Sequence, residues 1–367
     1  MRTTLYKLLF LLALSPSLIF CSNGPNFSDL NGKHTKEKKI SKKFSVSPEA
    51  LLKISNSYGN IDISTWDQNT VSIEVIIKTT GNDAQKVQDK LDEITVDFKQ
   101  TGAGVNARTI FTKENRSWWN ILFSGSNNVN MEVNYLVRAP VTNNVDLSND
   151  YGNIYLDKLT GNSKISCDYG RIDIGELRGN SNQINFDYSR NSSFGYINRA
   201  VINADYSEFT VEDARSLEIN ADYTNSKIKR VELLQFNCDY GSLSVDKVKR
   251  INGSGDYLST KIGELYQSAD LNLDYGSASI EKIIKGAGEV KINTDYTGVK
   301  IGYDANHPFS FSLNSSYGSV KGLDNFEINK QSQSSNNKSY SGYHLNASGR
   351  GNIIINSTYA GITFQKQ

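Results

Sequence analysis

Aspartates are the acidic residues with the most regular spacing in this sequence, and arrays of carboxylates can bind cations or act as acids and bases. An aspartate stands directly before a tyrosine in nine places: Asp150, Asp168, Asp187, Asp205, Asp222, Asp239, Asp256, Asp274 and Asp295. We expect each carboxylate to accept the backbone N–H two residues on and so to hold a tight turn. Carboxylates stacked about 5 Å apart repel by roughly 0.8 kcal/mol per pair in water, which such hydrogen bonds can offset. We therefore predict no cofactor, with calcium binding by this column as the alternative.

The remaining groups that could do chemistry are few. His34, His307 and His344 do not stand at the spacing of metal ligands, and none pairs by motif with a serine or cysteine nucleophile. A carbohydrate-active enzyme would need a site where the repeat breaks, and the candidates are residues 189–199 and 302–307. Neither holds a cluster of catalytic groups. We predict that the protein is not an enzyme, with a polysaccharide-active enzyme as the alternative.

The two cysteines beyond the N-terminus occupy the same position relative to a tyrosine. Cys167 and Cys238 each stand two residues before one, four copies of the repeat apart. Strand spacing puts them about 19 Å apart, whereas a disulfide needs Cα atoms within about 7 Å. We predict that both are free and buried.

The tyrosines belong to a repeated phrase: apolar, Asn, small, Asp, Tyr, small. From Tyr151 onward they are 18, 19, 18, 17, 17, 17, 18, 21, 21 and 42 residues apart. Apolar residues four and two positions before Tyr alternate with polar ones, which predicts a strand with one buried face that includes the Tyr. Apolar residues three and five positions after Tyr predict a second strand beyond a corner. Glycine often follows the Tyr there, as a tight bend favours.

A unit this short cannot bury its apolar face alone, so the copies must stack. We predict an all-β fold, a parallel β-solenoid (β-helix) with rungs of about 18 residues. Stacked Tyr rings are expected to fill its core. An up-and-down barrel or propeller would need hairpins at shorter spacing or blades of more than 40 residues.

The N-terminus predicts export. Residues 1–22 resemble a signal peptide, because Arg2 and Lys7 precede a short apolar run that Pro16 ends. Cys21 is the candidate for lipidation, since bacterial lipoproteins are cleaved before such a cysteine, and ordinary cleavage nearby is the alternative. Residues 23–43 are predicted to be a Lys-rich linker, since residues 33–44 hold six lysines and one glutamate.

Residues 44–140 are predicted to be a β-rich cap that closes one end of the rod. The segment includes one full copy of the repeat around Tyr58, a helix over 83–93 with Ala84, Val87, Leu91 and Ile94 on one face, and further strands. Trp118 and Trp119 are candidate partner contacts, because two adjacent residues of a strand cannot both face one core. Residues 141–367 form the repeat domain, with a polar loop at about 325–350 and the last rung from 351 to 365.

Charge and polarity limit the partners. The net charge of +1 over 367 residues gives no general affinity for nucleic acid, and membrane contact is expected only through a lipid anchor. The outward columns rich in Asn and Asp suggest a glycan or an envelope protein as partner. Asn203, Asn220 and Asn237 are the candidate contacts in the repeat domain.

The repeat (Asn-x-Asp-Tyr-Gly-x-Ile-x-Ile), the signal and the opening residues 56–63 with Trp66 together resemble the bacterial "putative adhesin" β-strand-repeat family. The resemblance covers residues 44–367 and implies an exported binding or scaffold protein in the periplasm, outer membrane or cell surface of a Gram-negative bacterium. It brings no catalytic residues. A calcium-stabilised structural rod is a further alternative.

Overall fold

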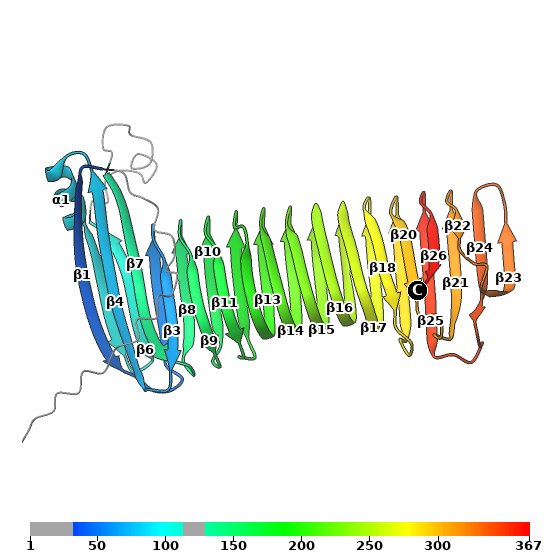
Figure 1. Cartoon of the computed structure of the whole chain (residues 1–367), viewed down its shortest axis with the longest axis horizontal. Coiled ribbons are helices and arrows are strands. Elements are labelled where there is room, and N and C mark those ends of the chain that lie inside the picture. The colour runs from blue at the N-terminus through cyan, green and yellow to red at the C-terminus, as the bar shows by residue number, and fades with distance from the viewer. Residues whose placement is uncertain (1–31, 113–128) are drawn as a thin grey trace, which may run out of the picture.

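The computed structural model describes residues 32–112 and 129–367. Within these ranges the chain is all-β, with 26 strands joined in one sheet and a single helix. The strands lie side by side along one long axis (Figure 1), so the described chain has the shape of a rod. The predicted signal peptide (1–22), Cys21, Trp118 and Trp119 lie outside the described residues.

One end of the rod is built from strands that pair antiparallel and from the single helix of the described residues. Its elements are β1 (His34–Ser45), β4 (Thr70–Gly81), α1 (Ala84–Glu93), β5 (Ile94–Thr101), β6 (Gly104–Phe111) and β7 (Val129–Pro140). The Asp83 carboxylate caps α1 by accepting the N–H groups of Gln85 and Lys86. Val87 and Leu91 are buried as predicted, whereas Ala84 is exposed.

The Lys-rich segment is not a linker from His34 onward. Residues 34–45 form β1, which pairs with β4 along its whole length. Ile40 and Phe44 turn their apolar side chains towards the core, while most of the lysines remain exposed. A strand at the edge of a sheet is protected from unwanted pairing by such lysines. The high lysine content therefore marks an edge strand here.

The repeat supplies most of the strands. The first copy provides β2 (Leu51–Ser57) and β3 (Ile61–Trp66). The next copies provide β8 (Asn144–Asp150), β9 (Ile154–Leu159), β10 (Ser163–Asp168), β11 (Ile172–Leu177), β12 (Asn182–Asp187), β13 (Ser192–Asp205), β14 (Glu208–Asp222), β15 (Asn225–Asp239), β16 (Gly241–Asp256), β17 (Leu258–Asp274), β18 (Ser277–Ile283), β19 (Glu289–Asp295) and β20 (Gly298–Tyr303).

Successive copies pair in parallel and place equivalent residues side by side. Before the tyrosine, Ile202 pairs with Ile219 and Ile219 with Phe236; after it, Val211 pairs with Ile228. These side chains are almost completely buried, as the alternation predicted. Cys167 and Cys238 are also buried and free, which confirms that prediction.

The C-terminal copies do not follow chain order. The last strands, β25 (Gly351–Thr358) and β26 (Ile362–Lys366), lie between β19 and β20 on one side and β21 (Phe309–Ser316) and β22 (Val320–Lys321) on the other. The final segment of the sequence is therefore an inner copy of the rod, not its end.

The predicted polar loop contains a hairpin that covers the far end of the rod. β23 (Glu327–Gln333) pairs with β24 (Asn337–His344), and β24 pairs antiparallel with β21 (Figure 1). The polar composition of this segment fits a hairpin whose outer strand is fully exposed. Its backbone is paired, although its sequence lacks the apolar alternation by which strands are recognised.

Aromatic rings and two histidines fill the core beneath this hairpin. Phe309 and Phe326 pack edge to face, and Tyr303 contacts both rings and His344. The Gly286 N–H donates to Nδ1 of His307, and Nδ1 of His344 donates to the His307 carbonyl oxygen. Burial is the main cause that lowers the pKa of His307, and the nearby His344 lowers it further.

We expect Ile219→Ala to destabilise the protein by about 2–5 kcal/mol, because the side chain is fully buried and its loss leaves a cavity. Glu218→Ala is the matched control. Glu218 is the exposed neighbour of Ile219, so its loss should change stability by no more than about 0.5 kcal/mol. Urea unfolding followed by circular dichroism measures both. Equal losses in the two variants would contradict the assignment of inner and outer faces.

Acid should weaken the far end of the rod. The folded pKa of His307 lies below its ordinary value of about 6.5, so the unfolded chain binds this proton more readily. The stabilisation by neutral His307 is present above pH 6.5 and is lost as the pH falls below it. We expect the melting temperature to fall less between pH 7 and pH 5 in His307→Gln than in wild type. Identical pH profiles would exclude this role for His307.

Candidate functional site

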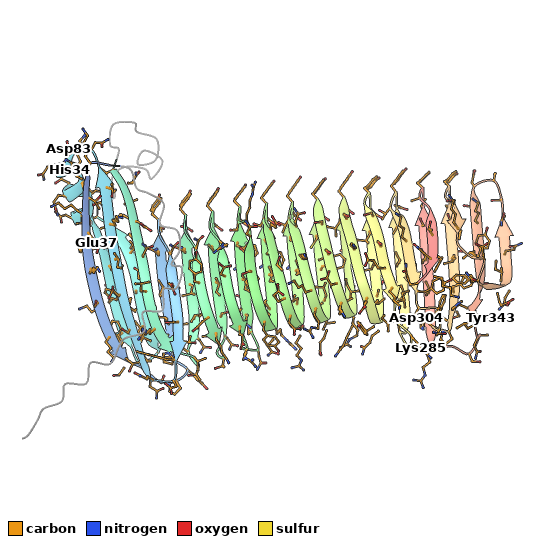
Figure 2. All side chains as sticks on the ribbon, viewed as in Figure 1. His34, Glu37, Asp83, Lys285, Asp304 and Tyr343 are labelled. Carbon is orange, nitrogen blue, oxygen red and sulfur yellow. The ribbon has the colours of Figure 1, made fainter. Side chains whose placement is uncertain are left out.

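Twelve tyrosines, one from each copy, stack along one edge of the rod, and we call this row the tyrosine ladder. Neighbouring ring centroids are 4.6–5.4 Å apart and the ring planes lie within 13° of parallel. Side chains stand at regular intervals along the edges of the rod (Figure 2). In spatial order the members are Tyr58, Tyr151, Tyr169, Tyr188, Tyr206, Tyr223, Tyr240, Tyr257, Tyr275, Tyr296, Tyr359 and Tyr317.

The prediction that these rings fill the core is wrong. Eleven of the twelve residues expose between 38% and 56% of their surface. The cause is the backbone conformation, because all twelve tyrosines have a positive φ, between 51° and 63°. A left-handed residue breaks the alternation of a strand, so a side chain assigned to the inner face by counting points outwards instead.

The left-handed conformation costs a residue other than glycine about 1–2 kcal/mol, and pairing between copies holds it in place. The Tyr223 N–H donates to the Asp239 carbonyl oxygen at 2.9 Å, and the same bond recurs along the ladder. The glycines after Tyr were expected to provide the bend, but they are needed because the backbone of the neighbouring copy leaves no room for a side chain. Gly152 does not have a positive φ, but a Cβ there would lie only 1.8 Å from the Gly59 carbonyl oxygen.

Buried hydroxyls brace the corner where the residue after Tyr is Ser or Thr. The Thr224 hydroxyl donates to the carbonyl oxygen of Asp222 and accepts the Ser207 N–H at 3.1 Å. The Ser207 hydroxyl accepts the N–H of Ser189 in the same way. These bonds link each corner to the next. The corner therefore depends on the Asp, the Tyr and the residue that follows the Tyr.

The aspartates form a second column beside the ladder. The Asp187 carboxylate accepts the backbone N–H of Asp205 at 3.1 Å, and Asp205 accepts that of Asp222 at 3.0 Å. The expected turn within one copy is therefore wrong at Asp187, because the N–H two residues on donates to a hydroxyl of the next copy. The carboxylates instead connect neighbouring copies.

Partial burial is the main cause that raises the pKa of Asp187; the Asp205 N–H lowers it, and the charges of Asp168 and Asp205 raise it. The pKa values of Asp150, Asp168 and Asp256 are raised as well, also mainly by burial. A raised folded pKa means that the folded state binds protons more readily than the unfolded chain. These four carboxylates therefore oppose folding at neutral pH and do so less as acid neutralises them.

The three predicted asparagines lie together on the outward face of neighbouring strands. Asn203 is in register with Asn220, and Asn220 with Asn237. The Asn220 amide donates to Asn203 at 3.0 Å, and Asn203 donates to Asn185 at 2.7 Å. Asn203 and Asn237 are exposed and Asn220 is half-buried. Each of these three copies thus presents an amide, a carboxylate and a phenol at one edge.

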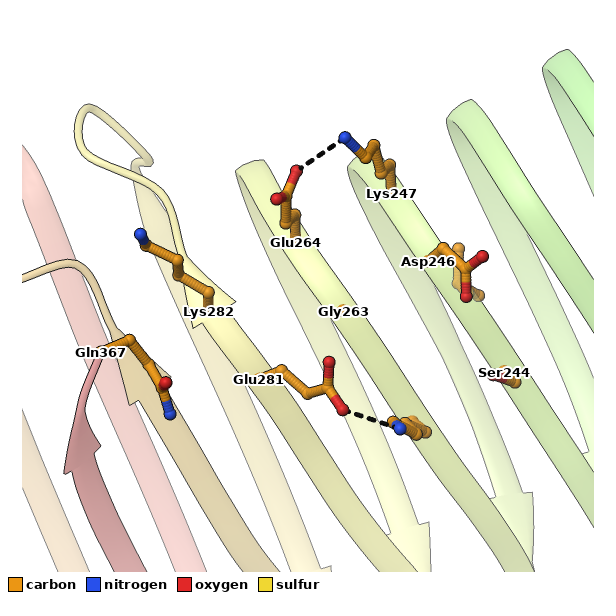
Figure 3. Close-up of a pocket in the computed structure, with 10 residues that line it drawn as sticks. Ser244, Asp246, Lys247, Gly263, Glu264, Glu281, Lys282 and Gln367 are labelled. Atoms are coloured by element: carbon orange, nitrogen blue, oxygen red, sulfur yellow. Dashed lines mark ion pairs between the residues drawn. The ribbon is translucent and has the colours of Figure 1, made fainter.

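A shallow hollow of about 370 Å³ lies on the outward face of β16, β17 and β18 (Figure 3). Gly263 contributes no side chain there, and Lys247 pairs with Glu264 at 3.3 Å and Lys261 with Glu281 at 2.7 Å. The Tyr266 hydroxyl is the main cause that lowers the pKa of Glu264. A catalytic acid needs the opposite shift, so Glu264 does not have the property expected of one.

The two segments considered for catalysis have different surroundings. Residues 302–307 run into the aromatic core, where Tyr303 and His307 are buried, and residues 192–199 belong to β13. In the described part of the chain, no three His, Cys, Asp or Glu side chains are grouped as a metal site requires. Nor does any helix there have the length and apolar character to cross a membrane.

Comparison with solved structures finds distant likenesses. A "putative cell adhesion protein" from Clostridium sporogenes is 9% identical with a TM-score of 0.21, covering 90% of this chain and 100% of that one. A "putative adhesin" from Parabacteroides merdae is 12% identical with a TM-score of 0.36, covering 71% and 95%. Another from Bacteroides fragilis is 10% identical with a TM-score of 0.32, covering 89% and 97%.

The names of these proteins agree with the family that the repeat resembles. No family model matches the sequence, and no curated protein matches it. With identities and TM-scores this low, the likenesses carry no functional inference, and the proposal below depends on the geometry of this chain.

The left-handed corner predicts an unusual order of stabilities for substitutions at Tyr223, which has a φ of 52°. Tyr223→Phe keeps the ring and should change stability by no more than about 0.5 kcal/mol. Tyr223→Asn loses the stacking but tolerates the conformation, whereas Tyr223→Val adds strain of about 1 kcal/mol or more. Thermal unfolding should rank Phe, Asn and Val in that order. A valine variant as stable as the asparagine variant would contradict the role of the corner.

Proposed function

We propose that this chain is an exported, non-enzymatic binding protein of the bacterial cell envelope whose tyrosine ladder, with the Asp and Asn columns beside it, forms an adhesin-like contact surface. The observation that carries the proposal is the exposure of the ladder. Monomeric proteins rarely leave large aromatic side chains exposed in a continuous row, and such rows mark interaction sites. Eleven of the ladder's twelve tyrosines expose between 38% and 56% of their surface, in one unbroken row.

We further propose that the stacked copies constitute a β-solenoid with rungs of about 18 residues. The parallel pairing on both sides of the tyrosine corner supports this architecture. A solenoid repeats the same outward groups at each strand spacing of about 4.8 Å, so the ladder extends over about 50 Å. Its outer surface is therefore a periodic array.

The geometry of the ladder defines what it can contact. The faces of inner rings are covered by their neighbours, so the ladder offers ring edges and phenolic hydroxyls. Beside them lie carboxylates, which accept hydrogen bonds, and amides, which donate and accept them. A partner that carries many hydroxyls along an extended chain would match these groups copy after copy.

A linear polysaccharide is the partner class that this array fits best. Sugar hydroxyls can donate to the Asp column and to the Asn amides, and sugar C–H groups can pack against ring edges. Each contact is weak, but a partner with a repeat similar to that of the array gains affinity through many simultaneous contacts. A protein partner would need a strand or helix with a matching row of side chains.

The ladder proposal can be tested by removing three neighbouring rings. We expect Tyr206→Asn, Tyr223→Asn and Tyr240→Asn combined to weaken binding at least tenfold, because asparagine tolerates the corner but removes the contact surface. The assay is a panel of linear bacterial polysaccharides, followed by calorimetry with the tightest binder. The matched control is Glu212→Gln with Lys229→Gln, an ion pair on β14 and β15 away from the ladder. Wild-type affinity in the folded triple variant would remove the ladder from the site.

The contribution of the asparagine column can be separated from that of the rings. Asn203→Ala, Asn220→Ala and Asn237→Ala combined should weaken binding about fivefold to tenfold while the rod stays folded, since these side chains point outwards. Unchanged binding would limit the contact surface to the ladder and the aspartates. If wild-type protein binds no polysaccharide in the panel, the glycan proposal is wrong, and an envelope protein becomes the partner to seek.

Protease treatment of intact cells tests the proposed location. Digestion of the repeat domain on whole cells would place it at the surface, as an adhesin requires. Protection that ends only when the outer membrane is opened would place it in the periplasm, where the same surface would serve as an envelope scaffold. Retention in the cytoplasm would contradict export.

A further inference from the structure

We propose that the tyrosine ladder is a site of oxidative modification, at which a peroxidase with hydrogen peroxide joins neighbouring rings as dityrosine. The product would be a covalent connection between adjacent copies along the edge of the rod. This inference depends on the geometry of the rings and does not require the ladder to bind a glycan.

Ring geometry brings the reacting atoms together before oxidation. Tyr206, Tyr223 and Tyr240 have neighbouring centroids 4.8 Å apart and planes within 4° of parallel. The ortho carbons of one phenol therefore lie against the next ring. Backbone hydrogen bonds between copies hold the two residues side by side, and their half-exposed side chains are free on the solvent side to rotate from the stack into the coupled geometry.

The rings are also accessible and carry the proton that coupling must release. About half of the surface of Tyr223 is exposed, so an oxidant in solution can reach it. The pKa values of Tyr206 and Tyr240 are raised, mainly by burial and further by the adjacent tyrosines. Both are therefore neutral phenols at pH 7, and each must lose a proton together with its electron.

The reaction balances without a protein cofactor in this chain. Each of two neighbouring phenols loses one electron and its hydroxyl proton, which leaves two phenoxyl radicals. The radicals form one carbon–carbon bond between ortho positions, and the ring hydrogens at these carbons move to the oxygens, which restores both phenols. The two electrons and two protons convert one hydrogen peroxide molecule to two waters.

The described tyrosines outside the ladder lack a stacked tyrosine neighbour, exposure to solvent, or both. Tyr135 and Tyr303 are buried, and Tyr266 is exposed but donates its hydroxyl to Glu264. Among the described residues, ring contacts between two tyrosines occur only in the ladder. The described tyrosines outside the ladder therefore serve as internal controls for the oxidation.

The experiment oxidises the purified chain with horseradish peroxidase and hydrogen peroxide at submicromolar protein, where coupling within one molecule dominates. We expect dityrosine fluorescence in the monomer fraction, and mass spectrometry should find cross-linked peptides that join neighbours such as Tyr206 and Tyr223. The main variant changes every second ring to phenylalanine, which keeps the stack but separates the remaining tyrosines. Its substitutions are Tyr151→Phe, Tyr188→Phe, Tyr223→Phe, Tyr257→Phe, Tyr296→Phe and Tyr317→Phe.

This variant should lose at least nine-tenths of the intramolecular dityrosine. The control, Tyr155→Phe with Tyr196→Phe, Tyr266→Phe and Tyr343→Phe, leaves the ladder intact and should keep the wild-type yield. If the sixfold variant does not fold, Tyr223→Phe alone should abolish the cross-links that join position 223 to Tyr206 and to Tyr240. Cross-links between the other neighbouring tyrosines should remain. Undiminished yield in the folded sixfold variant, or dityrosine found only between molecules, would overturn the proposal. Cross-linking without glycan binding would leave it intact, so the two proposals fail separately.

Discussion

Parallel, in-register pairing between copies is the constraint on which the other features of the rod depend. It places each residue directly beside its equivalent in the next copy, so every choice is repeated along the length. An apolar residue becomes a continuous core, and an aspartate becomes a column of like charge. The fold can contain only residues that tolerate their own neighbours. Tyrosine meets this condition by stacking, asparagine by amide pairing, and aspartate by accepting a backbone N–H from the adjoining copy.

The corner converts this periodicity into a surface. Twelve left-handed tyrosines turn the chain at the same place in each copy, and the same backbone conformation points their rings outwards. The energetic cost of the corner and the exposure of the ladder are therefore one feature. Residues that could fill the corner with less strain, such as glycine or asparagine, would not build the row of rings. The retention of tyrosine there agrees with a role for the ring itself.

The sequence predicted the buried positions of each copy well, because in an extended strand every second residue faces the core. The inward positions around Ile219 and Ile228, the free cysteines and the short helix all follow from alternation and spacing. The outward direction of Tyr223 did not, because counting assumes that every residue keeps extended dihedrals. The available signal was the change from even to odd spacing of the apolar residues after Tyr, which we attributed to a bend at the following glycine. β1 and β23 are not predicted by alternation, because edge strands can be almost entirely polar. The insertion of β25 between β19 and β21 depends on contacts that composition does not encode.

The placement of β25 and β26 affects how the protein can be made. A repeat protein whose copies stack in chain order can fold progressively as it emerges from a ribosome or an export channel. Here β21 and the hairpin that covers it lack their parallel neighbour until β25 has been synthesised and enters between β21 and β19. The far end therefore remains open until β25 and β26 have been synthesised. A chain shortened by a single copy at its C-terminus would lose a layer from within the stack, and with it the attachment of the terminal hairpin.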